Sequence, residues 1–374
     1  MPKPFASQLL HAFSTFAIGG PQTRFAAIAN HFGRRYRHAI VAMDGNYACR
    51  ERLEPGLDID FPLGGLIKSS AVGNISFIRR FLRQTSPDLL VTYNWGAIDF
   101  AMANTLNPVR PRPLIRHIHA EDGFGPQETD RQLVRRVMIR RLYLRRSTVV
   151  VPSQTLRRIA TEVWRLDPAR ILYIANGVAR SSASTPCGQV EATPHGRPCV
   201  GTVAALRPEK NLGRLLRAFR RVADKIEATL VVVGDGPDRP YLERLSGQLG
   251  LEQSVQFLGH VEQPQKLYPT FDIFALSSDT EQMPITVLEA MAAGLPIVAP
   301  DVGDIGLVVA PENKALITKN NEEALAEALL RLLHDARLRR RIGSANRLRV
   351  SQDFSQEAMF QAYQRLFDPV NLGA

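Results

Sequence analysis

Residues 281–300 read EQMPITVLEAMAAGLPIVAP, and the architecture can be worked out from this stretch. Pro284 and the small apolar residues after it predict a helix that begins near Pro284, and the run up to Pro300 predicts a buried strand. Glu281 then lies at the mouth of the loop before the helix, and Glu289 lies inside the helix. We expect both carboxylates to face one ligand-binding cleft.

The chemistry of these two glutamates depends on what the cleft binds. A carboxylate that faces a sugar can accept hydrogen bonds from two hydroxyls, as acidic residues do for a nucleotide ribose in doubly wound folds. The amino terminus of the neighbouring helix favours phosphate. The alternative is that both glutamates only cap and solvate a surface helix. The spacing alone leaves both interpretations open.

Short apolar runs alternate with helical segments along the whole chain. Toward the amino terminus the pattern predicts a helix from Pro21 to Gly33 and strands at 7–14, 38–44, 89–94, 114–118, 148–152 and 171–174. After a segment rich in Ser, Thr, Pro and Gly it restarts, with strands at 199–204, 229–233, 255–258 and 272–276, helices at 211–226, 238–249 and 263–268, and amphipathic helices within 322–350. We predict an α/β protein with two doubly wound, Rossmann-like domains at 1–178 and 199–352, a linker at 179–198, and a cleft between the domains.

Segment 281–300 resembles the signature of the family 4 glycosyltransferases, which are retaining, nucleotide-sugar-dependent enzymes of the GT-B type. The shared pattern is Glu, seven residues, Glu, followed by EAMA and GxPIVA. Further matches follow in family order and span most of the chain: Gly19 and Gly20, His119, NGV at Asn176 to Val178, RPEKN at Arg207 to Asn211, and VVVGDGP at Val231 to Pro237. The resemblance implies two facing domains, with residues 353–374 forming a helix that crosses back to the first. It also implies retention of configuration, by front-face displacement without a carboxylate nucleophile.

The resemblance implies a donor site in the second domain. Glu289 would hold the ribose, Glu281 the donor sugar, and Lys210, with help from Arg207, the diphosphate. Negative charge builds on the diphosphate as its bond to the sugar breaks, and a preorganised cation lowers that barrier. The alternative for the PEK triplet around Lys210 is an ordinary charged helix start.

The resemblance also implies a reaction centre in the first domain. His119 would border the donor sugar, so the catalytic candidates are His119, Lys210 and Glu281. Glycines at 19 and 20 would let the backbone approach the transferred group, although a glycine pair is more often a tight turn. Glu121 and Asp122 form a polar loop in which an acceptor hydroxyl could be oriented or deprotonated.

Two positions depart from the family pattern. Ala205 stands where the family generally has an arginine, so Arg207 would have to reach the same phosphate. Gln282, Met283 and Pro284 replace a Gly, aromatic, Gly run whose amides contact the donor sugar. Proline has no N–H, so those contacts would come from Gln282, Met283 or Ile285.

The amino-acid composition limits which class of protein and which kinds of partner are expected. The chain has 374 residues, of which 45% are hydrophobic and 22% charged, as in ordinary globular proteins, and its formal net charge is +11. A basic surface attracts anions, whether nucleotides, nucleic acids or anionic membranes. No nucleic-acid-binding motif accompanies the charge, so nucleic acid is not an expected partner.

The cysteine, histidine and apolar patterns indicate which features we do not expect: metals, bound cofactors, a secretory signal and membrane-spanning segments. Cys49, Cys187 and Cys199 lie in no disulfide or metal-ligand spacing, and the histidines form no ligand pair, so we expect no metal and no permanently bound cofactor. The amino-terminal stretch does not read as a secretory signal, and charged residues, Pro or Gly interrupt every apolar run. A cytoplasmic protein is expected.

Residues 131–146, RQLVRRVMIRRLYLRR, contain seven arginines and no acidic residue. On a helical projection Arg131, Arg135, Arg141 and Arg145 share one broad arc with Arg146, whereas Leu133, Val137 and Leu144 lie on another. Such a helix can rest on anionic lipid, which would place the protein at the inner membrane face. A solvated or ion-paired helix is the alternative.

These observations together predict a retaining glycosyltransferase. It would move a sugar from a UDP- or GDP-sugar to a hydroxyl of a glycan or lipid-linked acceptor, in the assembly of a surface glycan. Two alternatives remain. A nucleotide-sugar epimerase or phosphorylase can share the two-domain plan. A non-catalytic protein that binds a nucleotide or a partner enzyme would also explain Ala205 and Pro284.

Overall fold

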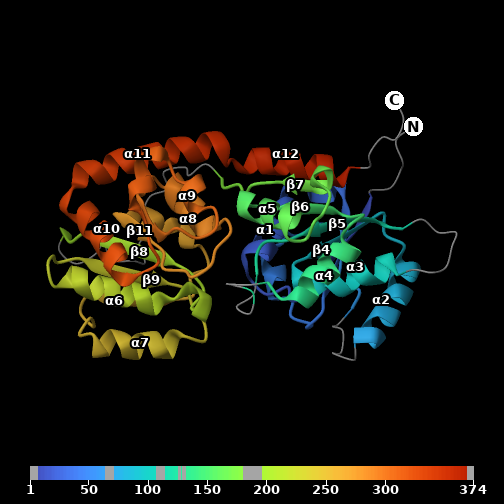
Figure 1. Cartoon of the computed structure of the whole chain (residues 1–374), viewed down its shortest axis with the longest axis horizontal. Coiled ribbons are helices and arrows are strands. Elements are labelled where there is room, and N and C mark those ends of the chain that lie inside the picture. Colours follow the sequence, from blue (N-terminus) through green and yellow to red (C-terminus); the bar gives the residue numbers. More distant parts are fainter. Residues whose placement is uncertain are drawn as a thin grey trace. The chain divides into compact units, whose positions relative to one another are not determined.

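The computed structural model describes residues 7–63, 71–106, 114–124, 128, 132–179 and 196–368. The chain divides into two compact units, the first comprising Met1–Ala175 with Met359–Ala374 and the second Asn176–Ala358. Each unit contains one parallel sheet with helices packed on it (Figure 1). The predicted α/β class with two doubly wound domains is confirmed. The predicted domain boundaries and the cleft between the domains stay predictions.

The sheet of the first unit has the strand order β3-β2-β1-β4-β5-β6-β7, so the order reverses between β1 and β4. Its strands are β1 (Gln8–Phe13), β2 (Arg37–Ala42), β3 (Ile59–Asp60), β4 (Leu89–Tyr93), β5 (Arg116–Ala120), β6 (Thr148–Val151) and β7 (Ile171–Tyr173). Its helices are α1 (Gly20–Phe32), α2 (Ala71–Thr85), α3 (Ile98–Thr105), α4 (Val134–Tyr143), α5 (Gln154–Glu162) and most of α12 (Gln356–Phe367).

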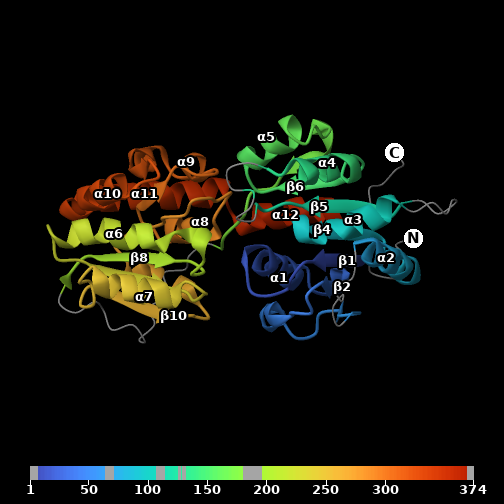
Figure 2. The ribbon, with the colours of Figure 1, turned by 60° about the horizontal axis from the view of Figure 1, so that its bottom comes forward.

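Helices cover both faces of this sheet, and the central strands are therefore buried, mostly with apolar side chains and with a few buried polar ones such as Thr92 and His119. One core joins α1 and α12 to strand residues such as Phe13 and Ile118. The opposite core joins α2 and α3 to residues such as Leu10 and Leu90. The ribbons of α2 and α3 beside the sheet can be followed in Figure 2. Ile118 and Ala120 belong to the first of these cores, so His119, between them, points to the opposite face.

Helix α12 is fixed to the first unit at its carboxyl end. The Arg116 guanidinium donates hydrogen bonds to the carbonyl oxygens of Phe367 (2.6 Å) and Asp368 (3.0 Å). These carbonyls lie at the end of the helix, where intrahelical donors run out. The Tyr36 hydroxyl donates to the Asp368 carboxylate at 2.7 Å. A cation and a phenol thus cap the last helix.

The sheet of the second unit has the order β10-β9-β8-β11-β12-β13 and reverses between β8 and β11. Its strands are β8 (Cys199–Val203), β9 (Thr229–Val233), β10 (Val255–Gly259), β11 (Ile273–Ala275), β12 (Ile297–Pro300) and β13 (Ile317–Thr318). Its helices are α6 (Leu212–Ala223), α7 (Arg239–Gln248), α8 (Ile285–Ala292), α9 (Ile305–Val308), α10 (Glu322–His334) and α11 (Ala336–Asp353).

Two predicted helical segments differ from the structure. Segment 263–268 is not one helix, so this prediction was wrong: it forms two 3₁₀ turns, Pro264–Lys266 and Tyr268–Thr270. Pro269 removes a backbone N–H, and its ring would clash with an α-helix continuing through it. Within the described residues 132–146, the arginine-rich segment is helical from Val134 to Tyr143.

Candidate active site

The candidate donor site lies at the point where the second sheet reverses its strand order. Ligands of doubly wound sheets bind beyond the carboxyl ends of the strands at such a point. Lys210 ends the 3₁₀ turn after β8, and Glu281 lies in the loop between β11 and α8. Glu289 lies within α8, with Pro284 as its N-cap residue. The predicted placement of Glu281 before the helix and of Glu289 inside it is therefore confirmed.

Lys210 and Glu281 form an ion pair. The Lys210 ammonium donates to Glu281 Oε1 at 2.5 Å, and the two side chains are 24% and 10% exposed. The Ser278 hydroxyl donates to the same carboxylate oxygen at 2.7 Å. A cation and a carboxylate are thus held side by side while both remain accessible to solvent, as a charged ligand requires.

A network of polar side chains holds the Lys210 loop against the Glu281 loop. Asn211, in a left-handed conformation, caps α6 and donates to Asp279 at 3.0 Å. Arg214 donates to the same carboxylate at 2.5 Å and to the Ser277 carbonyl at 2.8 Å. Because these bonds join residues more than 60 positions apart, the spacing of the ion pair does not depend on one flexible loop.

Two glycines permit close contact between neighbouring loops at this edge. Gly303, at φ 59°, lies so near the Glu281 carbonyl that an added Cβ would be 2.1 Å from its oxygen. A Cβ on Gly236 would be 2.4 Å from the Leu206 carbonyl oxygen. Any larger residue would force these loops apart, so glycine is required for the packing at both positions.

Glu289 is prepared to accept hydrogen bonds. Its Oε2 accepts one from the buried Tyr268 hydroxyl at 2.7 Å, and among the described residues Oε1 has no hydrogen-bond donor. Burial raises the pKa of the Glu289 carboxyl, and the Tyr268 hydrogen bond opposes that rise. One carboxylate oxygen is therefore fixed and the other is left for a ligand.

The amino end of α8 also leaves donors uncommitted. The backbone N–H groups of Met283 and Ile285 find no acceptor within the described part of the chain. Gln282 and Met283 are buried, and the Met283 carbonyl accepts from the Asn176 side chain at 2.8 Å. Arg207 is exposed, and its guanidinium has no partner in the described ranges.

His119 lies inside a buried chain of polar groups in the first unit. The ring is 0% exposed, with Nδ1 2.8 Å from the Thr92 hydroxyl and Nε2 3.4 Å from Glu121 Oε2. The same Thr92 hydroxyl lies 2.9 Å from His117 Nε2. Both ring nitrogens of His119 therefore have protein partners.

Glu121 is equally buried, and α4 supplies its counter-ion. Arg140 Nε donates to Glu121 Oε2 at 3.1 Å, and Arg140 Nη1 donates to Glu128 at 3.3 Å. Arg140 is 0% exposed and lies over the rings of Trp95 and Trp164, at 5.0 and 4.8 Å from their centroids. Glu121 Oε1 and Arg140 Nη2 are buried without a hydrogen-bond partner. This cluster holds Glu121 and Glu128 against α4.

Asp122 forms a two-pronged ion pair with Arg24 of α1. Burial alone would lower the pKa of the Arg24 guanidinium, but its charge and hydrogen-bond interactions with Asp122 outweigh burial and raise it. The Asp122 N–H donates to the Asn94 side chain at 2.7 Å. Asn94 has φ 56° and ψ 179°, a conformation that is strained for a non-glycine residue.

Gly19 and Gly20 lie at the amino end of α1, after β1. A Cβ on Gly20 would meet no atom within 4 Å, and one on Gly19 would meet only the Gln22 side chain. Backbone packing therefore does not require glycine at either position.

The basic segment divides between two environments. Arg135, Arg141 and Arg145 are exposed, whereas Arg136 and Arg140 pair with buried glutamates. Arg131 and Cys187 lie outside the described residues, as does most of the predicted linker, and Cys49 and Cys199 are free thiols. No group of three potential metal ligands occurs in the described part of the chain, nor does any helix long and apolar enough to cross a bilayer.

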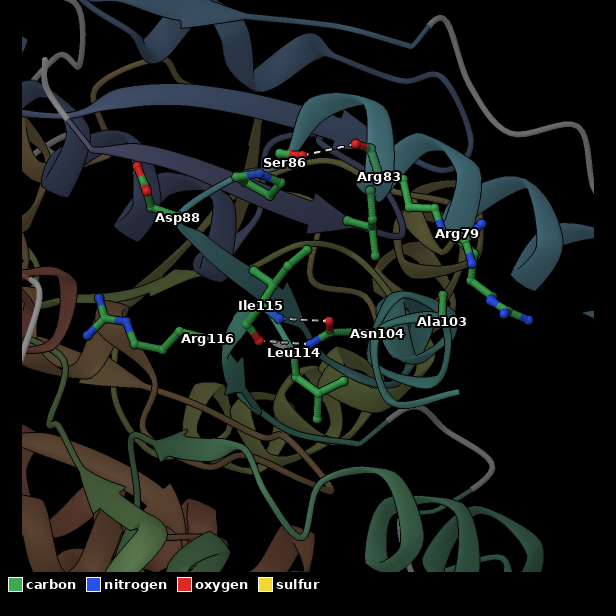
Figure 3. A pocket seen from close by; sticks show the side chains of 11 residues that line it. Arg79, Arg83, Ser86, Asp88, Ala103, Asn104, Leu114, Ile115 and Arg116 are labelled. Carbon is green, nitrogen blue, oxygen red and sulfur yellow. Dashed lines mark hydrogen bonds between the residues drawn. The ribbon is translucent and has the colours of Figure 1, made fainter. Parts of the chain in front are cut away.

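A pocket of about 290 Å³ opens at the other edge of the first sheet, near the amino ends of β4 and β5 (Figure 3). Arg79, Arg83 and Arg116 line it together with apolar side chains such as Leu82 and Leu114. None of the predicted site residues borders it. Ligands of doubly wound sheets bind at the carboxyl edge, so we assign this pocket no part in the reaction.

Several supporting residues were not predicted from the sequence. Tyr268, Asn94 and Arg24 each contact a candidate residue 21 or more positions away, and such pairings leave no local pattern. Ser278 and Asp279 lie within four residues of the carboxyl end of the buried strand β11, and that position is a signal that could have identified them.

Two family models match the chain in succession. The model described as Glycosyltransferase Family 4 matches residues 18–181, and the one described as Glycosyl transferases group 1 matches residues 188–349. Together they cover both units.

Named relatives and solved structures agree with these matches. The lipopolysaccharide core biosynthesis glycosyltransferase LpsD of Rhizobium meliloti is 30% identical over 56% of this chain and 61% of its own length. A GDP-mannose-dependent alpha-mannosyltransferase of Mycolicibacterium smegmatis is 37% identical over 41% and 39%, respectively. The chain thus spans about half the length of such curated relatives. HepE of Anabaena, solved with UDP and glucose, superposes with a TM-score of 0.80 at 18% identity, covering 96% of this chain and 99% of HepE.

Proposed function

The chain belongs to the family 4 glycosyltransferases, and from this premise we propose that it transfers a sugar from a UDP- or GDP-sugar to an acceptor hydroxyl with retention of configuration. The observation that carries the proposal is the Lys210–Glu281 ion pair, 2.5 Å across, at the reversal point of the second sheet. It joins a cation for the diphosphate to a carboxylate for the sugar hydroxyls.

The neighbouring groups suit the remaining parts of a nucleotide sugar. Glu289 Oε1 would accept a hydrogen bond from a ribose hydroxyl while Tyr268 holds Oε2. The N–H groups of Met283 and Ile285 would contact the donor in place of the amide that Pro284 lacks. The Arg207 guanidinium has no partner in the described ranges, so it could bind a phosphate without breaking an existing ion pair. Arg207 would then take the place of the arginine that the family generally has at position 205. Contacts of this kind would allow catalysis despite the departures from the family pattern.

In the first unit His119 would border the transferred sugar from a fixed position. Its ring is held by Thr92 and Glu121, so it would act as a preorganised neighbour of the reaction centre. Glu121 and Asp122 are engaged with arginines, and we assign them to orienting the acceptor loop. Gly19 and Gly20 would admit the transferred group.

The acceptor is proposed to be a glycan or a lipid-linked precursor, and the place of action the cytoplasmic face of the membrane. The relative from Rhizobium builds lipopolysaccharide core by its name, and the one from Mycolicibacterium uses GDP-mannose. The Anabaena structure holds UDP and glucose. These relatives therefore support both nucleotides, and only measurement selects one.

The test is calorimetric titration of UDP, GDP and their common sugar conjugates into wild-type protein and Glu289→Ala. We expect selective binding of one nucleotide, weakened about tenfold or more in Glu289→Ala because a hydrogen bond to a charged group is lost. Glu327→Ala, an exposed glutamate on α10 of the same unit, is the matched control and should bind as wild type does. The selected sugar nucleotide is then used in acceptor screens, with the anomeric configuration of the product read by NMR.

Each outcome decides between the candidate functions. Transfer with retention supports the proposal, and conversion of the donor into a different nucleotide sugar without an acceptor points to the epimerase. Selective binding without turnover favours a non-catalytic nucleotide-binding protein, and no binding to any nucleotide overturns the proposed donor site.

A further inference from the structure

Helix α4 exposes three of its apolar side chains and turns two of its arginines inward, while Val137 and Ile139 pack against the core. Val134 and Met138 are each 65% exposed and Leu142 is 50% exposed, and their spacing of four residues aligns them in one stripe. Arg136 and Arg140 lie on the opposite side, paired with Glu121 and Glu128. A helix that faces only water has the reverse arrangement. Packing within the described chain therefore does not account for this stripe.

Cationic side chains flank the stripe. At about 100° per residue, Arg141 lies beside Val134, and Arg135 lies beside Leu142. Both arginines are exposed, as is Arg145 just past the end of the helix. Residues 132–146 contain no acidic side chain. The surface is thus an apolar centre with a cationic rim, the pattern of a helix that lies in the interface of a bilayer.

We propose that this surface, made by Val134, Met138 and Leu142 with Arg135, Arg141 and Arg145, binds an anionic phospholipid bilayer. The apolar stripe enters the boundary between headgroups and acyl chains, and the arginines remain at the level of the lipid phosphates. The net charge of +11 adds long-range attraction. The proposal deepens the membrane location given under the proposed function and rests on it only for the link to a lipid-linked acceptor.

A second copy of the chain fits this surface less well than lipid does. Two copies related by a twofold axis would bring the same arginine rims together, and like charges oppose association. An anionic bilayer would instead pair with all three arginines of the rim and bury the apolar stripe among its lipids.

The experiment is flotation of the wild-type protein with vesicles of phosphatidylcholine alone or mixed with phosphatidylglycerol, in the absence of any sugar nucleotide. We expect binding only to the anionic vesicles, weakened by salt. The variant Arg135→Gln/Arg141→Gln/Arg145→Gln should lose about a hundredfold in partitioning, since each well-placed arginine contributes about fivefold. Val134→Ser/Met138→Ser/Leu142→Ser should lose about tenfold and keep a salt-sensitive remainder.

Matched controls come from α11 of the second unit, a helix that also exposes several arginines and an apolar residue. Arg337→Gln/Arg340→Gln/Arg341→Gln removes the same charge, and Leu348→Ser removes a residue that is 59% exposed. Both controls should bind almost as wild type does. Met138→Trp should keep binding and gain a blue-shifted fluorescence component on anionic vesicles, which would show insertion even if the serine variant folds poorly.

Three results would overturn the proposal: no wild-type binding, equal losses in the α4 and α11 variants, or a dimer that Met138→Ser dissociates. The flotation experiment contains no sugar nucleotide, so a negative result would not contradict the proposed sugar transfer. In the same way, a negative calorimetric titration would not contradict vesicle binding.

Discussion

The carboxyl edges of the two sheets both gather charged side chains but use them differently. In the second unit, Lys210 and Glu281 remain partly exposed, and Glu289 keeps one oxygen without a partner among the described residues. In the first unit, His119 and Glu121 are 0% exposed and bonded to protein. Polar groups that remain accessible are available to a ligand, whereas groups that are buried against one another fix geometry. The first edge should therefore respond to mutation mainly in stability, and the second mainly in function.

The largest effect that would sharpen this comparison is expected at Arg140. Arg140→Met removes the counter-ion of the buried Glu121 and one of the two arginines that pair with the buried Glu128. The free energy of unfolding should therefore fall by about 3–5 kcal/mol. The chain contains two tryptophans, Trp95 and Trp164, and both contact Arg140. Urea unfolding followed by tryptophan fluorescence therefore reports on the first unit.

The neighbouring Arg141 is the control, because it is exposed on the same helix. Arg141→Met should change the same free energy by less than about 0.5 kcal/mol. Equal effects from the two substitutions would break the distinction between a buried, structural edge and an exposed surface.

The next effect is expected at Lys210, and it should appear in turnover. Lys210→Ala removes the cation that faces the leaving diphosphate, so kcat/KM for sugar transfer or donor hydrolysis should fall about 100- to 1000-fold. The unfolding midpoint in urea should shift little, because the side chain is 24% exposed. Lys225→Ala, exposed at the end of α6, is the control and should leave kcat/KM unchanged. A large loss of stability in Lys210→Ala would mean that this edge is structural as well.

A smaller effect is expected from acid, and it should appear in the first unit. Burial lowers the pKa of His38 to about 4 and of His117 to about 3. Below the unfolded value of about 6.5, the unfolded chain binds protons that the folded unit does not, so stability falls as the pH drops. Each histidine should contribute a slope of about 1.4 kcal/mol per pH unit, from about pH 6.5 down to its folded pKa.

Urea unfolding by tryptophan fluorescence over a pH series measures this slope. His117→Gln should reduce this slope, because it removes one of the two buried histidines. A slope that is unchanged in His117→Gln would contradict the assignment.

The smallest effect is expected at Tyr268. The Tyr268 hydroxyl opposes the burial-driven rise in the pKa of Glu289, so Tyr268→Phe should raise that pKa further. Nucleotide affinity, which needs the carboxylate, should then be lost at a higher pH than in wild type, with a loss at neutral pH of at most about tenfold. Titration calorimetry over a pH series measures the midpoint. An unchanged midpoint would show that Tyr268 does not control this carboxylate.

Much of the fold could be predicted because strands buried on both faces form short apolar runs between helices. The local pattern of residues Glu281 to Pro300 is sufficient to predict a loop, a helix and a strand in that order. The two 3₁₀ turns within 264–270 were mistaken for one short helix. Pro269 has no backbone N–H and opposes an α-helix continuing through it, whereas Pro264 alone would be compatible with a helix start.

The candidate site was less predictable where its contacts are distant in sequence. Glu281 and Lys210 were named from local motifs, but the Arg24–Asp122 pair spans 98 positions and leaves no local trace. On α4, a helical projection showed two arcs and could not show which one faces the core, since arginines occur on both. Only the buried glutamates at 121 and 128 turn Arg136 and Arg140 inward.

The discontinuity of the first unit bears on how the protein is made. Residues 176–358 form one contiguous unit and can fold as soon as they leave the ribosome, whereas the first unit also needs residues from Met359 onward. Until then the apolar surface that Phe360 and Phe367 cover is open on the nascent chain, and chaperones or self-association can act on it. Synthesis therefore completes the two units in the reverse of their order along the sequence.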